Sequence, residues 1–124
     1  MEQEISTSSL MNIPKSFTIN GQSVTIDIVD RLDGMYGHYS DAEEKITIAR
    51  TIESDGRIIK LSPLQLENTF WHEVFHVFQF HGKGRYDEAE SATYAGMLTE
   101  LIRSSGLRIN PNEIVVNKPE VYEE

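Results

Sequence analysis

The chain contains no cysteine, which excludes disulfide bonds and any metal site built on thiolates. It also has no apolar run long enough to span a bilayer. Residues 1–9 are polar and acidic and include no hydrophobic segment, so they do not resemble a secretory signal. From these absences we expect a cytoplasmic protein with no membrane partner.

Positive charge is also scarce. The 124 residues include 11 Lys and Arg against 20 Asp and Glu, a formal net charge of −9. An acidic surface repels a phosphate backbone, which argues against direct nucleic-acid binding, and it attracts basic protein segments. There is no glycine-rich phosphate loop either. We therefore expect the partner to be a protein or peptide that serves as substrate. A regulatory protein is one such substrate.

The length and a hydrophobic content of 39% predict one domain with one core. Residues 1–13 lack hydrophobic periodicity and are expected to form a flexible arm. Residues 14–116 are expected to form the folded domain, and residues 117–124 an acidic tail.

Alternating apolar residues on both sides of Asn20-Gly21 predict a β-hairpin, because both turn residues accept the positive φ of a two-residue turn. With such a turn, Phe17 lies opposite Val24 and the hairpin has one apolar face. Residues 45–49 predict a third strand, and residues 57–60 predict either a short fourth strand or an approach to the helix. The polar, glycine-containing segment 30–41 predicts a loop.

A long helix is predicted to begin at Ser62, which can form a capping box with Gln65 on either side of Pro63. We expect it to continue to about His81 and to stop at Gly82. A second helix is predicted from Asp87 to near residues 105–106. The expected fold class is therefore α+β, a small antiparallel or mixed sheet of three or four strands packed against two helices.

The first of these helices contains the pattern His-Glu-x-x-His. His72 and His76 are four residues apart, so their imidazoles lie on one helix face and can bind one metal ion. Glu73 lies beside that position, where it can act as general base for a water molecule. The alternative is a surface helix with two unrelated histidines. The apolar neighbours disfavour it, because buried polar groups need partners. These neighbours are Phe70, Trp71, Val74, Phe75, Val77, Phe78 and Phe80.

A catalytic zinc ion usually takes three protein ligands, so one more is needed. His81, Asp87, Glu88 and Glu90 are the candidates. His81 is expected to point elsewhere on the same helix. Glu88 and Glu90 lie in the first turn of the next helix, which a short connection could bring over the first. We favour Glu88, because Glu90 also fits a capping box with Asp87.

Tyr36, His38 and Tyr86 are candidates for transition-state or substrate contacts, since they stand in segments expected to flank the site. Packing within the loop is the alternative interpretation for Tyr36 and His38.

The zinc helix and the residues that follow it resemble the ImmA/IrrE-type metallopeptidases, especially the compact members carried by bacteriophages and mobile elements. The quoted residues are Phe70-Trp71-His72-Glu73-Val74-Phe75-His76, then, after a short gap, Asp87-Glu88-Ala89-Glu90-Ser91-Ala92-Thr93-Tyr94-Ala95. Gly34-Met35-Tyr36-Gly37 and the later Ile46-Thr47-Ile48 also resemble the segment before that family's zinc helix. The resemblance covers roughly residues 24–105, and His-Glu-x-x-His is its one sharp motif.

This resemblance implies a zinc-dependent peptidase fold in which an edge strand of the sheet can pair with substrate. It implies His72 and His76 as ligands, Glu73 as general base, and an acid of the second helix as third ligand. Family members differ in where that acid stands relative to an aromatic-Ala pair. This chain has an acid at both places, so Glu88 and Glu90 both stay open.

We therefore predict a peptidase that uses one Zn²⁺ ion and binds an extended peptide along the strand at residues 45–50. The alternative is a non-catalytic, zinc-stapled binding module that sequesters a regulatory protein. The sequence leaves the substrate and the oligomeric state open.

Overall fold

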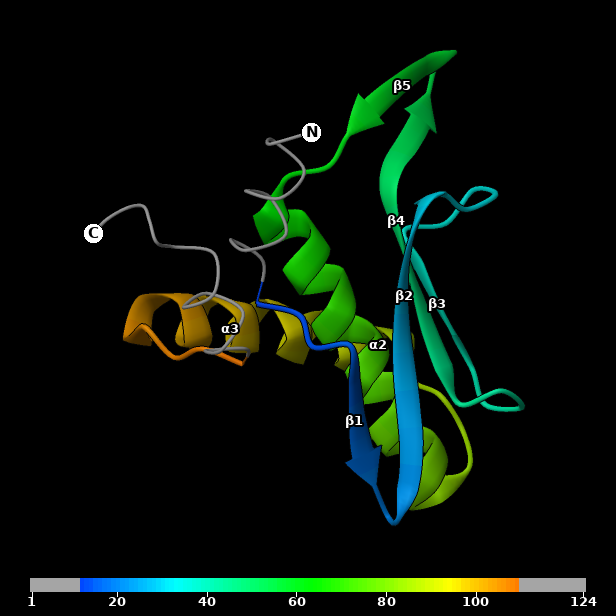
Figure 1. The fold of residues 1–124 in the computed structure, drawn as a ribbon, viewed down its shortest axis with the longest axis vertical. Helices are drawn as coiled ribbons and strands as arrows, with labels where there is room; N and C mark the ends of the chain where they lie inside the picture. The colour runs from blue at the N-terminus through cyan, green and yellow to red at the C-terminus, as the bar shows by residue number, and fades with distance from the viewer. Residues whose placement is uncertain (1–11, 110–124) are drawn as a thin grey trace.

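The computed structural model describes residues 12–109 as a five-stranded sheet followed by two helices (Figure 1). This confirms the α+β class, although the sheet has one strand more than the upper expectation of four. In chain order the elements are β1 (Ser16–Ile19), β2 (Gln22–Arg31), β3 (Gly37–Ser40), β4 (Lys45–Ser54), β5 (Arg57–Lys60), α2 (Pro63–Lys83) and α3 (Glu88–Ser105).

The hairpin of β1 and β2 forms as the sequence predicts. Asn20 and Gly21 have φ values of 52° and 76°, so both turn residues are left-handed. Phe17 pairs with Val24 across the hairpin, and Val24 is fully buried. The turn therefore fixes the register that directs the apolar face of the hairpin to the core.

β4 is the central strand of the sheet. It pairs in parallel with β2 on one side, and on the other side antiparallel with β3 and then with β5. Because β4 is paired on both sides, the prediction that a peptide adds to residues 45–50 is wrong. Within the described strands, β3 pairs with β4 only and leaves an edge unpaired.

β3 lies inside the segment 30–41 that the sequence predicts as a loop. Only Tyr39 among its four residues is buried, so the strand has no apolar alternation to reveal it. Backbone pairing with β4 holds it instead, in a register that places Tyr39 beside Ile46. This long-range pairing could not be read from the local sequence.

The central helix α2 begins with the predicted capping box. The backbone N–H of Gln65 donates to Ser62 Oγ at 3.2 Å, and the N–H of Ser62 donates to Gln65 Oε1 at 2.8 Å. The helix ends at Gly84, two residues beyond the predicted stop, and Gly82 stays helical. Gly84 adopts φ 73° and its N–H donates to the carbonyls of Gln79 and Phe80.

The core lies between one face of the sheet and α2, and α3 packs on α2 (Figure 1). Its buried members are Ile13, Val24, Tyr39, Ile46, Ile48, Leu61, Leu66, Phe70, Val74 and Val77. Sheet contacts on one side and α3 on the other explain why α2 is apolar over most of its circumference. Within residues 12–109, neither helix combines the length and apolar content that crossing a membrane requires.

Asn12 and Ile13, which the sequence assigns to the arm 1–13, are buried, with exposed fractions of 5% and 7%. The backbone N–H of Asn12 donates to the carboxylate of Glu67 at 2.9 Å. The packed domain therefore begins no later than residue 12. The rest of the predicted arm, the end of the predicted domain and the tail 117–124 lie outside the described residues.

Candidate metal centre

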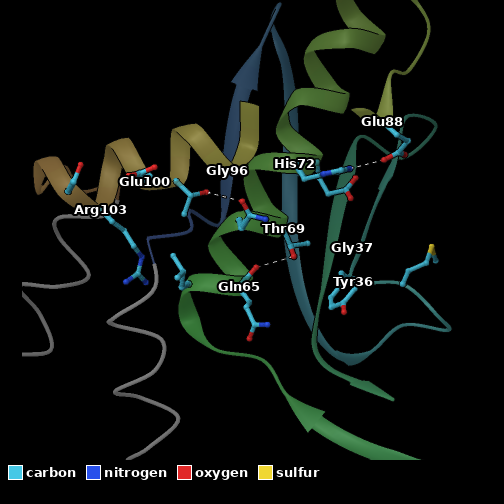
Figure 2. A pocket seen from close by; sticks show the side chains of 15 residues that line it. Tyr36, Gly37, Gln65, Thr69, His72, Glu88, Gly96, Glu100 and Arg103 are labelled. Atoms are coloured by element: carbon cyan, nitrogen blue, oxygen red, sulfur yellow. Dashed lines mark hydrogen bonds and ion pairs between the residues drawn. The ribbon is translucent and has the colours of Figure 1, made fainter. Parts of the chain in front are cut away.

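The two histidines of the His-Glu-x-x-His pattern converge on one carboxylate. His72 and His76 lie one turn apart in α2, with ring centroids 4.8 Å apart. His72 Nε2 is 2.9 Å from Glu88 Oε1, and His76 Nε2 is 3.1 Å from Glu88 Oε2. Figure 2 shows the first of these contacts reaching from α2 to the start of α3. Glu88 therefore bridges both imidazoles.

Potential ligand atoms of His72, Glu73 and His76 all lie within 4.8 Å of one another, so this group could hold a metal ion. The short connection between the helices brings the carboxylate of Glu88 to the same position. Gly84 turns the chain out of α2, and Asp87 caps α3 by accepting the N–H of Glu90 at 3.0 Å.

Glu90, the other candidate third ligand, is held elsewhere. Its Oε1 accepts a hydrogen bond from Gln79 Nε2 at 2.7 Å and lies 3.7 Å from Lys83 Nζ. His81, as expected, points away from the histidine pair and contacts Glu44 at 3.0 Å. The structure thus brings Glu88, and not Glu90, to the two histidines.

Gln79 is a buried residue of the site that the sequence analysis missed. Its Oε1 accepts the backbone N–H of Asp87 at 3.0 Å and lies 3.1 Å from His76 Nδ1. Its Nε2 donates to the carboxylate of Glu90. Because a backbone N–H can only donate, the oxygen of this amide must face Asp87 and, with it, His76. His76 Nδ1 therefore carries a hydrogen, and Nε2 presents a lone pair to the metal position.

When the imidazole is neutral, this tautomer leaves His76 Nε2 and Glu88 Oε2 as two acceptors that face each other at 3.1 Å. Either a proton on Nε2 or a metal ion between the two atoms satisfies both. Two ligands at about 2.1 Å from one tetrahedral ion lie about 3.4 Å from each other. The histidine nitrogens and the Glu88 oxygens lie 2.9 and 3.1 Å apart, so these atoms would have to separate by only a few tenths of an ångström to hold such an ion.

Glu73 is buried, with an exposed fraction of 6%. A Cβ atom added to Gly37 would lie 3.3 Å from both Cγ and Oε2 of Glu73. The start of β3 therefore covers this carboxyl group closely, and only glycine permits the approach. The sequence places Gly37 in the segment Gly34-Met35-Tyr36-Gly37 that carries the resemblance, but does not predict its contact with Glu73.

The two carboxyl groups have opposite environments. Burial, with a smaller effect of the nearby Glu88 charge, raises the pKa of Glu73 from 4.5 to about 8. Burial also acts to raise the pKa of Glu88, but the hydrogen bond with His72 and the charge of His76 outweigh it and lower that pKa. One acid near the histidines thus favours its proton while the other favours its charge, which is typical of acid–base pairs in enzymes.

The aromatic candidates lie in different places. Tyr86 is beside the site, with its ring centroid 5.2 Å from that of His76, and its hydroxyl donates to Asp41 Oδ2 at 2.7 Å. Burial and this hydrogen bond raise the pKa of Tyr86. Tyr36 lines a groove next to the histidines. His38 is next to the buried Tyr39 in β3, and successive side chains of a strand point to opposite faces. His38 therefore lies on the outer face of the sheet and is not a candidate for a substrate contact.

A groove of about 1110 Å³ opens beside the metal position (Figure 2). One wall is formed by residues 35–37, the floor by the first half of α2, and the other wall by α3. His72, Glu73 and Glu88 line its inner end. A molecule in this groove therefore has direct access to the metal position.

No family model, curated protein or solved structure matches this chain. The resemblance to the ImmA/IrrE-type metallopeptidases stays a prediction that rests on the residues quoted above.

Proposed function

We propose that this protein is a zinc-dependent peptidase. The observation that supports it most is the convergence of His72 Nε2, His76 Nε2 and the Glu88 carboxylate on one position beside the buried Glu73. Two imidazoles and a carboxylate, with a fourth position left for water, form a ligand set that catalytic zinc sites of peptidases use.

Each residue of the site has a role in this proposal. Zinc held by His72, His76 and Glu88 would supply a water of lowered pKa and polarise the substrate carbonyl. Glu73 accepts the proton of the attacking water and passes it to the leaving amine. Tyr86, which lies against His76, and Tyr36 in the groove contact the substrate.

The proposed substrate is an extended peptide. Gly37 begins the edge strand β3 and approaches Glu73, so β3 replaces residues 45–50 as the strand that borders the scissile bond. A regulatory protein as the natural substrate and a cytoplasmic location stay predictions from the sequence.

The proposal is tested with purified protein, a mixed peptide library and mass spectrometry. We expect one zinc ion per chain and peptide cleavage that a chelator abolishes. Glu73→Gln should keep the zinc, because Glu73 is not a ligand, and should lower the cleavage rate by about 10²–10⁴-fold. His76→Ala should lose the zinc itself.

A zinc-loaded Glu73→Gln variant with the full cleavage rate would contradict the assigned base. Stoichiometric zinc without cleavage of any library peptide would contradict the peptidase and favour the zinc-stapled binding module.

A further inference from the structure

The groove beside the metal position follows the seam between the two helices. Its floor is lined by residues spaced four apart along one face of α2, namely His72, Asn68 and Leu64. From residue 64 to residue 72 the helix rises about 12 Å, which is the length of about three to four residues of extended chain. We name this space the seam groove, defined by residues 35–37 and by the α2 and α3 residues that line it.

Five polar side chains of the seam groove already have partners within the protein. Thr69 donates to the carbonyl of Gln65 at 3.1 Å, and Thr99 donates to the carbonyl of Ala95 at 2.7 Å. Gln65 caps α2, Asn68 accepts from Thr99, and Ser104 donates to Leu101. The surface offered to a ligand away from the metal is therefore mainly carbon.

Three large apolar side chains border this surface and are well exposed. Met35, Tyr36 and Leu64 have exposed fractions of 41%, 54% and 48%. On the opposite wall, Gly96 contributes no side chain, and a Cβ atom there would meet nothing within 4 Å. Gly96 thus leaves room for apolar side chains of a ligand.

Within residues 12–109, the outer end of the seam groove carries one charged side chain without an ion-pair partner. Arg103 is paired, because its Nε and Nη2 donate to Glu67 at 2.9 and 3.0 Å. Glu100 has no ion-pair partner among residues 12–109 and lines the groove one turn from Arg103 (Figure 2). This carboxylate favours a basic group in the ligand.

We propose that the seam groove binds the substrate on one side of the cleaved bond as an extended segment of two apolar residues and one Lys or Arg. The apolar residues lie nearest the metal, between Tyr36 and Gly96, and the basic residue reaches Glu100. The inference rests on the proposed function, because it assigns the sequence preference of that peptidase.

Binding is measured by NMR titration of the ¹⁵N-labelled protein with capped tripeptides, which does not depend on cleavage. The probes are acetyl-Leu-Leu-Lys-amide and acetyl-Lys-Leu-Leu-amide, with Glu in place of Lys, or Gly in place of both Leu, as comparisons. We expect shifts at Tyr36, Gly96 and Thr99. One of the two Leu-Leu orders should bind about tenfold more tightly than its Gly-Gly counterpart. Lys should be preferred over Glu by about fivefold.

Two variants test the two parts of the groove separately. Gly96→Trp should weaken the Leu-Leu peptides by about tenfold or more, because the indole would occupy the apolar space. Gly82→Trp is the matched control: Gly82 is also a helical glycine with nothing within 4 Å, but it does not line the groove. Glu100→Gln should abolish the preference for Lys over Glu and keep the preference for Leu over Gly.

Shifts that map to another surface, or equal binding of Leu-Leu and Gly-Gly peptides, would overturn the proposal. So would unchanged binding by Gly96→Trp with unchanged zinc affinity and circular dichroism. Binding as expected without any peptide cleavage would retain the groove and reject the peptidase. Cleavage by Gly96→Trp at the wild-type rate, with the same preference, would retain the peptidase and reject the groove.

Discussion

Gln79 shows how a residue outside a candidate ligand set can orient a member of it. Its amide oxygen fixes the Nδ1–H form of His76, while its amide nitrogen binds Glu90 at the start of α3. The same side chain therefore orients an imidazole and positions the helix that carries Glu88.

We predict that Gln79→Leu lowers zinc affinity by about 10–100-fold, because His76 loses the partner that fixes its tautomer. Competition with a chelator measures the affinity, and ¹⁵N chemical shifts of the imidazole report the tautomer in the metal-free protein. Ser91→Ala is the comparison from the same network: it removes the longer contact of His76 Nδ1, at 3.3 Å, and leaves the 3.1 Å contact with Gln79 in place, so its effect should be smaller. Unchanged affinity and tautomer in Gln79→Leu would contradict this role.

A second prediction concerns the contact between β3 and α2. In Gly37→Ala the new methyl group would lie 2.5 Å from Thr69 Cγ2 and 3.3 Å from Glu73. We expect a loss of about 1–3 kcal/mol in the free energy of unfolding. To relieve the clash, β3 would have to move away from α2, which would disturb its pairing with β4. Urea unfolding measures this loss.

Thr69→Ser supplies the test of that cause. It removes the methyl group that the new Cβ meets and keeps the hydroxyl that bonds to Gln65. The double variant should recover most of the stability that Gly37→Ala loses. A double variant as unstable as Gly37→Ala would mean that the clash is not the cause.

Predictions about single residues succeed where the period of one helix determines which side chains share a face. His72 and His76 share a face because helix geometry alone places them there. The choice between Glu88 and Glu90 depends on how α3 is rotated over α2, which local sequence does not determine. Gln79 was missed for the same reason, since Asp87 and Glu90, its main partners, belong to the start of the next helix.

At the scale of elements, short-range chemistry explains what could be predicted. The Asn20-Gly21 turn and the capping box at Ser62 involve neighbours in sequence, and both form as expected. The existence of β3 was not predicted, because it depends on pairing with β4. The end of α2 was misplaced by two residues, because Gly82 and Gly84 both fit a helix stop. Helix ends are commonly uncertain by that amount.

At the end of the helix pair away from the histidines, the two members of one ion pair differ in burial. Glu67 is nearly buried, with a side-chain exposure of 3%, whereas its partner Arg103 is 42% exposed. Arg103→Leu should cost about 3–5 kcal/mol, because it leaves a buried carboxylate without its cation. Glu67→Gln should cost less, about 1–2 kcal/mol, because the arginine left behind can be hydrated.

Urea unfolding of both variants at neutral pH measures the two losses. If Glu67→Gln and Arg103→Leu lower the free energy of unfolding equally, the burial of Glu67 does not determine the energy of the pair.

On the scale of the whole molecule, α2 is the element that every other part of the site meets. The sheet buries one side of it, and the contacts with α3 include Glu88 at the histidines and Arg103 at Glu67. The seam groove lies between these two points. Zinc would therefore link the helices as well as serve the chemistry, and zinc at about 1,000 times its dissociation constant should add about 4 kcal/mol to stability.

The metal-free protein should lose stability as pH rises, because of Glu73. Its pKa is about 8 in the folded chain and 4.5 ordinarily, so between these pH values the unfolded state binds fewer protons than the folded state. The free energy of unfolding therefore falls with rising pH in that window. The lowered pKa of Glu88 acts in the opposite sense, but its effect is lost only as pH falls below the ordinary value.

We predict that the stability of wild type relative to Glu73→Gln declines steadily from pH 5 to pH 8 in the presence of a chelator. The comparison cancels the contributions of the groups that both proteins contain. Denaturant unfolding at several pH values measures the difference. A difference that stays constant across the window would show that the folded protein holds Glu73 ionised throughout, and would contradict the raised pKa of this buried acid.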